Sequence, residues 1–179
     1  MLNYIKVLSS KRTIWWLLFI SAFCLELSAL YFQHGMGLNP CVMCIYERVA
    51  LFGILFSGFI GLLAPRFILM RLLALVLGLW GAIKGLLLSI KHLDYQMHPN
   101  PWDQCPVTVE FPNTLPLDQW FPAIFHPTGL CSEISWTFLS FTMVQWLVFI
   151  FAVYSIIFVI ILLSQLLGGR VKNRRRLFH

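Results

Sequence analysis

The sequence predicts an all-α, polytopic membrane protein built as a four-helix transmembrane bundle, and two observations carry this prediction. First, 59% of the 179 residues are hydrophobic and only 11% are charged, with a mean hydropathy of +0.80. This composition is too apolar for a soluble domain of this size. Second, the apolar residues gather in four runs, each close to the roughly 20 residues that a spanning helix needs. We expect a single integral membrane domain over residues 1–179.

The four runs give the predicted elements in chain order. The spans cover about residues 14–32, 45–64, 68–90 and 143–167. Outer loops at about 33–44 and 91–142 and tails at 1–13 and 168–179 complete the chain. A cleaved signal peptide is the alternative for the first run, because basic residues precede it. The length of the run, the charge of Glu26 and the lack of a small-residue cleavage site before Gln33 favour a true span.

The distribution of charge predicts the orientation. Ten basic residues lie on one side of the predicted spans: Lys6, Lys11, Arg12, Arg66, Arg71, Arg170, Lys172, Arg174, Arg175 and Arg176. Between His92 and Met143 there is no lysine or arginine. By the positive-inside rule, both tails are cytoplasmic and both long loops face outward. The net charge of +6 is thus explained by the membrane, and we expect no nucleic-acid partner.

Two cysteines stand at the predicted entrance of the second helix. Cys41 and Cys44 end the first outer loop, with only Val42 and Met43 between them. Free backbone N–H groups and the positive end of the helix dipole favour a thiolate there. A Cys-x-x-Cys spacing also lets the two sulfurs close a small, reducible ring. This arrangement predicts a redox-active pair.

The same spacing can serve zinc, so a structural metal site is the alternative. Zinc ribbons usually supply a second close pair, but Cys105 and Cys131 lie 26 positions apart. We therefore expect no metal. In an oxidising compartment Cys105 and Cys131 would form a disulfide across the second outer loop, either as a structural staple or as a bond that exchanges with Cys41 and Cys44.

Arg48 and His92 are candidate partners for an electron acceptor dissolved in the membrane. Arg48 follows Cys44 by four residues, so it lies one helical turn deeper on the same face. A cation there would stabilise negative charge that develops on an acceptor, although arginines at helix ends also snorkel to the interface. His92 closes the third span at the same outer level and suits proton delivery near neutral pH.

Four other polar or reactive residues fall inside or next to predicted spans. Glu26 and Lys84 are costly in lipid, so we expect both to face the bundle interior. Glu47 is expected to remain a solvated or interfacial carboxylate. Cys24 lies inside the first span without a partner in register, and we interpret it as a small apolar residue.

The block around the first cysteine pair is much more specific than a bare Cys-x-x-Cys. It reads Pro40-Cys41-Val42-Met43-Cys44-Ile45-Tyr46-Glu47-Arg48. With it come Glu26-Leu27, Phe32-Gln33-His34, Ala50-Leu51-Phe52-Gly53, His92, Cys105, Phe111-Pro112, Leu115-Pro116-Leu117-Asp118, Gly129, Cys131 and Gln145-Trp146-Leu147. In these motifs the chain resembles, from end to end, the disulfide bond formation protein B family (DsbB), the quinone-linked reoxidants of periplasmic thiol oxidases.

The resemblance implies a thiol:quinone oxidoreductase of the bacterial inner membrane with its redox cysteines on the periplasmic side. Cys41 and Cys44 would face the quinone, either ubiquinone or menaquinone, and Arg48 and His92 would hold or polarise it. Cys105 and Cys131 would face a periplasmic thiol oxidase of the DsbA type. The lipid bilayer and its quinone pool complete the expected partners.

Two other interpretations compete. A vitamin K epoxide reductase-like protein also joins cysteines to a quinone in a small helical bundle, but its active Cys-x-x-Cys typically comes late in the chain. A structural tetraspan protein with stapled outer loops is the non-enzymatic alternative. It predicts that Cys41 and Cys44 resist reduction and that no quinone binds.

Overall fold

The computed structural model describes residues 2–98, 105–106, 108–112 and 116–167. The basic cluster expected in the tail after residue 167 lies outside the described residues.

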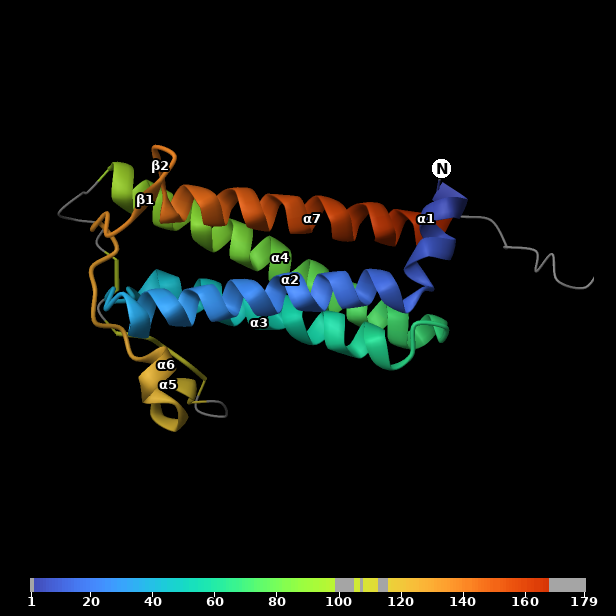
Figure 1. The fold of residues 1–179 in the computed structure, drawn as a ribbon, viewed down its shortest axis with the longest axis horizontal. Coiled ribbons are helices and arrows are strands. Elements are labelled where there is room, and N and C mark those ends of the chain that lie inside the picture. The colour runs from blue at the N-terminus through green and yellow to red at the C-terminus, as the bar shows by residue number, and fades with distance from the viewer. Residues whose placement is uncertain (1, 99–104, 107, 113–115, 168–179) are drawn as a thin grey trace, which may run out of the picture.

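Four long helices form the bundle, as predicted. They are α2 (Arg12–Leu30, continued by the π-helical turn η1 at Tyr31–Gly35), α3 (Val42–Leu63), α4 (Ile68–Met97) and α7 (Met143–Leu167). All four are long and apolar enough to cross a membrane. They run side by side along the long axis of the molecule (Figure 1). The fold class expected from the hydropathy pattern is confirmed.

The helices pack in a chain rather than in a closed ring. α2 packs against α3, α3 against α4, and α4 against α7, whereas α2 and α7 make little direct contact. One hydrogen bond, from the Tyr154 hydroxyl to Ser21 Oγ at 2.9 Å, links α2 and α7. The bundle therefore has one loosely joined side, between its first and last spans.

Small residues let α4 approach its neighbours closely. Gly78 and Gly85 lie against the rings of Phe158 and Phe151, and Gly81 lies against the backbone carbonyl of Ala50. A side chain at any of these three glycines would collide with the facing helix. This stripe of small residues fixes the face that α4 buries, as is common where helices pack within membranes.

The packing of α4 overturns one expectation about polar residues in the spans. Lys84 is exposed on the outer surface of the bundle rather than turned inward. The reason is geometric, because Lys84 is two positions from buried Ala82, about 200° around the helix. Glu26, in contrast, is buried as expected, and Cys24 is an exposed free thiol.

A short helix precedes the first span at the end of the molecule opposite the cysteines. This helix, α1 (Leu2–Ser9), falls where the sequence predicted only a tail. Hydrogen bonds hold it against the end of α7: Lys6 Nζ donates to the backbone carbonyl of Gln165 at 3.3 Å, and Gln165 Nε2 donates to Ser9 Oγ at 2.9 Å. The contacts close that end of the bundle.

The second outer loop crosses the other end, which we call the cysteine end (left in Figure 1). The loop contains α5 (Leu117–Trp120), α6 (Pro122–Phe125) and a hairpin of β1 (Thr137–Phe138) and β2 (Phe141–Thr142). In the hairpin Thr137 pairs with Thr142. α4 runs seven residues past the predicted end of its span at Ile90, because His92 and Tyr95 are buried at this end of the bundle.

Candidate functional site

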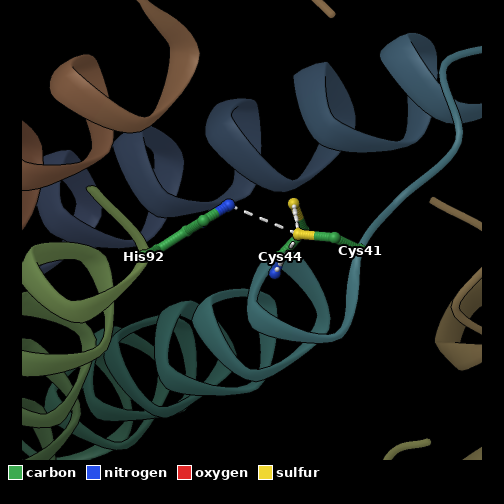
Figure 2. A group of neighbouring side chains, drawn as sticks. All are labelled: Cys41, Cys44 and His92. Carbon is green, nitrogen blue, oxygen red and sulfur yellow. Dashed lines mark hydrogen bonds between the residues drawn. The ribbon is translucent and has the colours of Figure 1, made fainter. Parts of the chain in front are cut away.

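Cys41 and Cys44 occupy the first turn of α3. Cys41 is the N-cap residue with extended backbone angles, and its sulfur accepts a hydrogen bond from the Cys44 N–H at 3.2 Å. The two sulfurs are 2.7 Å apart (Figure 2). N-cap side chains ordinarily accept a hydrogen bond from the N2 or N3 amide. Cys44 is the N3 residue of α3, so the Cys-x-x-Cys spacing itself brings the two sulfurs together. The Cys44 N–H, in the first turn of α3, thus donates to the Cys41 sulfur.

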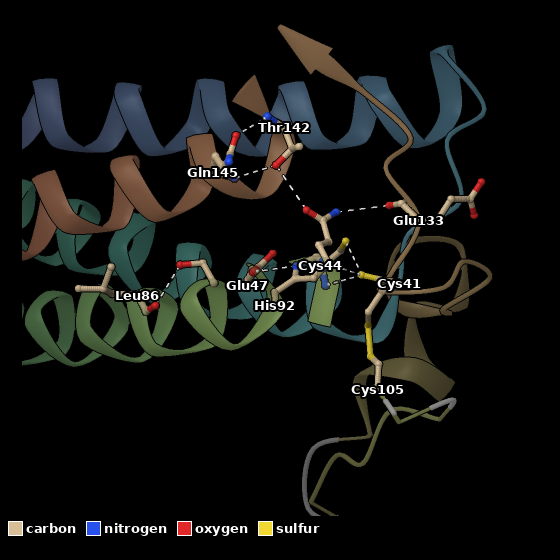
Figure 3. Close-up of polar contacts among 12 residues, drawn as sticks. Cys41, Cys44, Glu47, Leu86, His92, Cys105, Glu133, Thr142 and Gln145 are labelled. Carbon is tan, nitrogen blue, oxygen red and sulfur yellow. Dashed lines mark hydrogen bonds and ion pairs between the residues drawn. A yellow bond between two sulfur atoms is a disulfide. The ribbon is translucent and has the colours of Figure 1, made fainter. Parts of the chain in front are cut away.

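A histidine from α4 completes a chain of three polar groups. His92 Nε2 lies 3.4 Å from Cys41 Sγ, and His92 Nδ1 lies 3.1 Å from Glu47 Oε1 (Figures 2 and 3). The side chains of both His92 and Glu47 are only 2% exposed. Glu47 is therefore not solvated, contrary to the expectation from sequence, because α4 and the outer loop cover the first two turns of α3. The Glu47 carboxylate, the His92 imidazole and the Cys41 thiol therefore form a continuous chain of polar contacts.

Cys41, Cys44 and His92 also form a possible metal-ligand group, since their ligand atoms lie within 4.8 Å of one another. With zinc–sulfur bonds of about 2.3 Å, two sulfurs in a tetrahedral site are about 3.8 Å apart. The observed sulfur separation of 2.7 Å is more than 1 Å shorter. The geometry fits a pair that opens and closes a disulfide better than it fits a bound metal.

Arg48 lies one turn below Cys44, as its spacing predicts, and joins α3 to α6. Its Nη1 donates to Gln33 Oε1 at 2.8 Å and to the backbone carbonyl of Ile124 at 2.6 Å. Its Nε lies 3.9 Å from Glu26 Oε2. That Nε and both oxygens of Glu26 are buried without a hydrogen-bond partner. Such groups are costly to bury, so this ion pair is incompletely satisfied.

A cavity of about 380 Å³ joins these groups. Its polar lining includes Cys44, Arg48, His92 and Glu26, together with Cys41, Glu47, Gln33, Gln96 and Glu133. The rest of the wall is largely apolar and comes mainly from α2, η1, α7 and the loop, including Leu25, Phe32, Val144, Trp146, Leu147, Ile150 and Phe151. The cavity thus lies on the loosely joined side of the bundle, between α2 and α7.

The second cysteine pair lies beside the first. Cys105 and Cys131 form a disulfide with their Cα atoms 6.0 Å apart. Cys131 is buried in one cluster with Cys41, Met43 and Tyr95, and Cys105 packs on the edge of that cluster with partial exposure. One sulfur of the loop disulfide therefore faces the first pair, and the other is the more accessible from outside.

Backbone contacts hold the Cys131 segment against the Cys41 segment. The N–H groups of Thr128 and Gly129 both donate to the carbonyl of Pro40, at 2.9 and 3.0 Å. Gly129 lies so close to the backbone of Asn39 that a Cβ atom there would collide with the Asn39 carbonyl oxygen. This contact requires glycine, and it sets the distance between the two pairs.

Sequence reasoning missed two members of this site. Glu47 follows Cys44 by three positions, so helical spacing could have placed it on the cysteine face, but nothing linked it to His92 on another helix. Gln33 binds Arg48 through Oε1 and donates from Nε2 to the carbonyl of Ala123 at 3.0 Å. Both contacts depend on where the loop folds back, for which the sequence holds no periodic signal.

The fold and the site together define a class: a tetraspan membrane protein with a dithiol centre at one end, next to a second, disulfide-bonded pair. The comparisons with known proteins then show the family. The family model for the disulfide bond formation protein DsbB matches residues 11–161, so the chain belongs to the DsbB family. This membership decides against the vitamin K epoxide reductase-like alternative.

Similar proteins cover the chain from end to end. Proteins named disulfide bond formation protein B are 61% identical in Histophilus somni (strain 129Pt), over 99% of both chains, and 61% identical in Pasteurella multocida (strain Pm70), over 100% of both. One in Haemophilus influenzae (strain Rd) is 52% identical over 100% of both chains. The chain is a membrane-bound disulfide oxidoreductase of the family that supports disulfide bond formation.

Proposed function

We propose that this protein reoxidises a periplasmic thioredoxin-like oxidase of the DsbA type and passes the electrons to a membrane quinone, ubiquinone or menaquinone. The observation that carries the proposal is the order of the groups. The partly exposed Cys105, the buried Cys131 and Cys41, and then Cys44 on the wall of an apolar cavity lead inward. The charge distribution supports cytoplasmic termini and periplasmic cysteines in the inner membrane of a bacterium.

The thiol steps balance at each exchange. A thiolate of the partner attacks Cys105 Sγ, the Cys105–Cys131 bond breaks, and Cys131 leaves with the electron pair. Cys131 then attacks Cys41 Sγ, the bond between Cys41 and Cys44 breaks, and Cys44 becomes the thiolate. The second thiol of the partner attacks the partner–Cys105 bond, so the partner leaves as a disulfide and Cys105 is released as a thiolate. Cys105 then attacks Cys131 Sγ, which re-forms the Cys105–Cys131 bond and leaves Cys41 and Cys44 reduced. Partial exposure of Cys105 and burial of Cys131 support this direction, since exchange depends on access to the attacked sulfur.

The cavity suits a quinone. Its largely apolar walls match a ring with an isoprenoid tail, and its place between α2 and α7 gives access from the lipid. The buried Arg48 Nε–H has no hydrogen-bond partner among the described residues and would donate to a carbonyl oxygen of the ring. A bound quinone would supply a two-electron acceptor. Arg48 would hold its oxygen and stabilise negative charge, and His92 lines the same cavity.

The first test is anaerobic turnover of the detergent-solubilised protein with a reduced thioredoxin-like oxidase and a soluble quinone analogue. We expect one quinol for each partner disulfide formed. If the wild type leaves the quinone oxidised while its four loop cysteines stay bonded, the relay fails and the stapled tetraspan protein replaces it.

A further inference from the structure

The line along which α2 faces α7, which we call the α2–α7 seam, changes along its length. In the half away from the cysteines, Leu18 and Ala22 of α2 share one buried core with Phe158 of α7. In the half near the cysteines, the same two helices supply opposite walls of the cavity described above. The seam therefore has a packed half and a hollow half.

One hydrogen bond crosses the seam where these halves meet. The Tyr154 hydroxyl donates to Ser21 Oγ at 2.9 Å, and among the described residues this is the only hydrogen bond between α2 and α7. Tyr154 lies one helical turn deeper than Ile150, a residue of the cavity wall. Ser21 lies one turn deeper than Leu25, which also lines the cavity. The bond thus ties the two helices together at the base of the hollow half.

Both side chains are placed to keep this contact. The Ser21 hydroxyl donates to the carbonyl of Leu18 on its own helix at 2.9 Å, which leaves the oxygen lone pairs to accept from Tyr154. The Tyr154 side chain is buried, with 7% of the residue exposed. A buried tyrosine hydroxyl ordinarily has a hydrogen-bond partner, and within the part of the chain that the structure describes Ser21 is that partner.

The bond lies at the depth of the acyl chains. Tyr154 follows the first residue of α7, Met143, by eleven positions, which is about 16 Å along the helix axis. A bilayer has a hydrocarbon core of about 30 Å, so the bond stands near its middle. The cavity walls lie between this level and the cysteine end (Figure 1). A ligand dissolved in the lipid therefore meets the hollow half of the seam from the side.

We propose that the hydrogen bond between Tyr154 and Ser21 is a latch at the base of a lateral mouth, through which the quinone enters and leaves the cavity. The ring is wider than the tail, so α2 and α7 must part in the hollow half to admit it. The latch opposes that movement and re-forms once the ring is inside and the tail remains in the lipid. It sets the rate of quinone exchange and leaves the affinity unchanged. The inference rests on the proposed function, which supplies the quinone.

The test measures quinone binding without turnover. When both cysteine pairs are oxidised, the protein has no thiol electrons to give to the ligand. Trp136 and Trp146 line the cavity, so a bound quinone should quench their fluorescence. The protein in lipid nanodiscs is mixed rapidly with a benzoquinone that carries an alkyl tail, and the association and dissociation rate constants are measured. Wild type is compared with Tyr154→Phe, Ser21→Ala and the double variant.

Ser155→Ala is the matched control. The Ser155 hydroxyl donates to the carbonyl of Phe151 at 2.8 Å, so this variant removes a hydrogen bond within α7 and none across the seam. Tyr154→Phe leaves the Ser21 hydroxyl with its bond to Leu18, so it creates no unpaired donor. Melting temperatures check that each variant folds.

We expect Tyr154→Phe to raise both rate constants by about 3- to 10-fold, the factor that corresponds to the loss of one hydrogen bond, and to leave their ratio, the Kd, unchanged. Ser21→Ala should accelerate exchange at least as much, because it leaves the buried Tyr154 hydroxyl without a partner. The double variant should match Tyr154→Phe, since both lack the same single bond. Ser155→Ala should match wild type.

Rate constants of Tyr154→Phe equal to those of wild type would overturn the inference and leave the proposed function intact. Faster dissociation with unchanged association would also overturn it, because the hydroxyl would then stabilise the bound state rather than close the mouth. A double variant in which the two single effects add would assign them to separate contacts, and the latch would again be wrong. If no quinone quenches the tryptophans of the wild type, the proposed function falls together with the inference.

Discussion

The two cysteine pairs lie side by side but are held in opposite ways. Cys41 and Cys44 sit on one turn of a long helix, with a histidine, two carboxylates and an arginine placed around them by three spans. Cys105 and Cys131 are far apart in the sequence and are held by an outer loop that touches the bundle through backbone contacts. The helices fix the groups that surround Cys41 and Cys44, the inner pair. The loop leaves Cys105 and Cys131, the outer pair, accessible to a partner protein through Cys105. Each arrangement suits one side of a relay.

The sharpest way to break this comparison is to remove one sulfur from each pair. Cys44→Ser should abolish quinone reduction from every thiol donor, a loss on the order of 10³-fold or more. Cys105→Ser should lose turnover with the partner oxidase to the same extent. The Cys105→Ser variant should still reduce quinone when a small dithiol attacks the inner pair directly.

These two variants are measured with the same quinone assay and two donors, reduced partner and dithiothreitol. Equal losses with both donors in both variants would contradict the assignment of the outer pair to the partner and of the inner pair to the quinone.

Arg48→Ala tests whether the inner pair depends on its surroundings. We expect the quinone KM to rise about 10- to 100-fold, corresponding to about 1.5–3 kcal/mol for the loss of bonds to a charged group. The rate of thiol exchange with the partner should change much less. Arg66→Ala, an exposed arginine at the opposite end, is the control. A KM for quinone that stays at the wild-type value would remove Arg48 from the site.

Gly129→Ala tests the contact that joins the two pairs. The new methyl group would collide with the Asn39 carbonyl, and overpacking of this kind costs about 1–3 kcal/mol. Turnover with the partner should therefore fall about 10-fold, whereas turnover with dithiothreitol stays the same. Gly53→Ala, where a Cβ would meet only an ordinary contact at 3.6 Å, should have no effect on either donor.

Tyr46→Phe tests a weaker anchor of the outer loop. The Glu110 N–H donates to the Tyr46 hydroxyl at 2.8 Å on the exposed rim of the site. Losing one such bond costs about 0.5–1 kcal/mol, so turnover with the partner should fall about two- to fivefold. Tyr31→Phe, at an exposed tyrosine of η1, is the control. A larger effect than that of Gly129→Ala would reverse the assigned order of the two anchors.

The spans and the cysteine pairs could be predicted from the sequence, because both leave local signals. Hydropathy runs mark helices that must satisfy their backbone inside lipid, and Cys-x-x-Cys at a helix start places two sulfurs on one turn. The Gly81-xxx-Gly85 spacing is a further local signal, because it marks the packed face of α4.

The contacts between elements could not be predicted. Glu47 and His92 are 45 positions apart, so their bond depends on how α3 crosses α4 rather than on any local pattern. On α6, Arg48 donates to the backbone carbonyl of Ile124. No side-chain motif in the sequence predicts a contact with a backbone group. α1 is a single short helix held by hydrogen bonds to the end of α7. In each case tertiary packing decided the outcome.

The length of α4 has a consequence for the lipid around the protein. The helix contains 30 residues, about 45 Å at 1.5 Å per residue, whereas a bilayer has a hydrocarbon core of about 30 Å. His92 lies 24 residues from the start of α4, or about 36 Å along its axis. Even with the usual tilt of about 20°, the imidazole stands at the headgroup boundary. A bilayer a few ångströms thicker would therefore bring the level of His92 within the acyl chains.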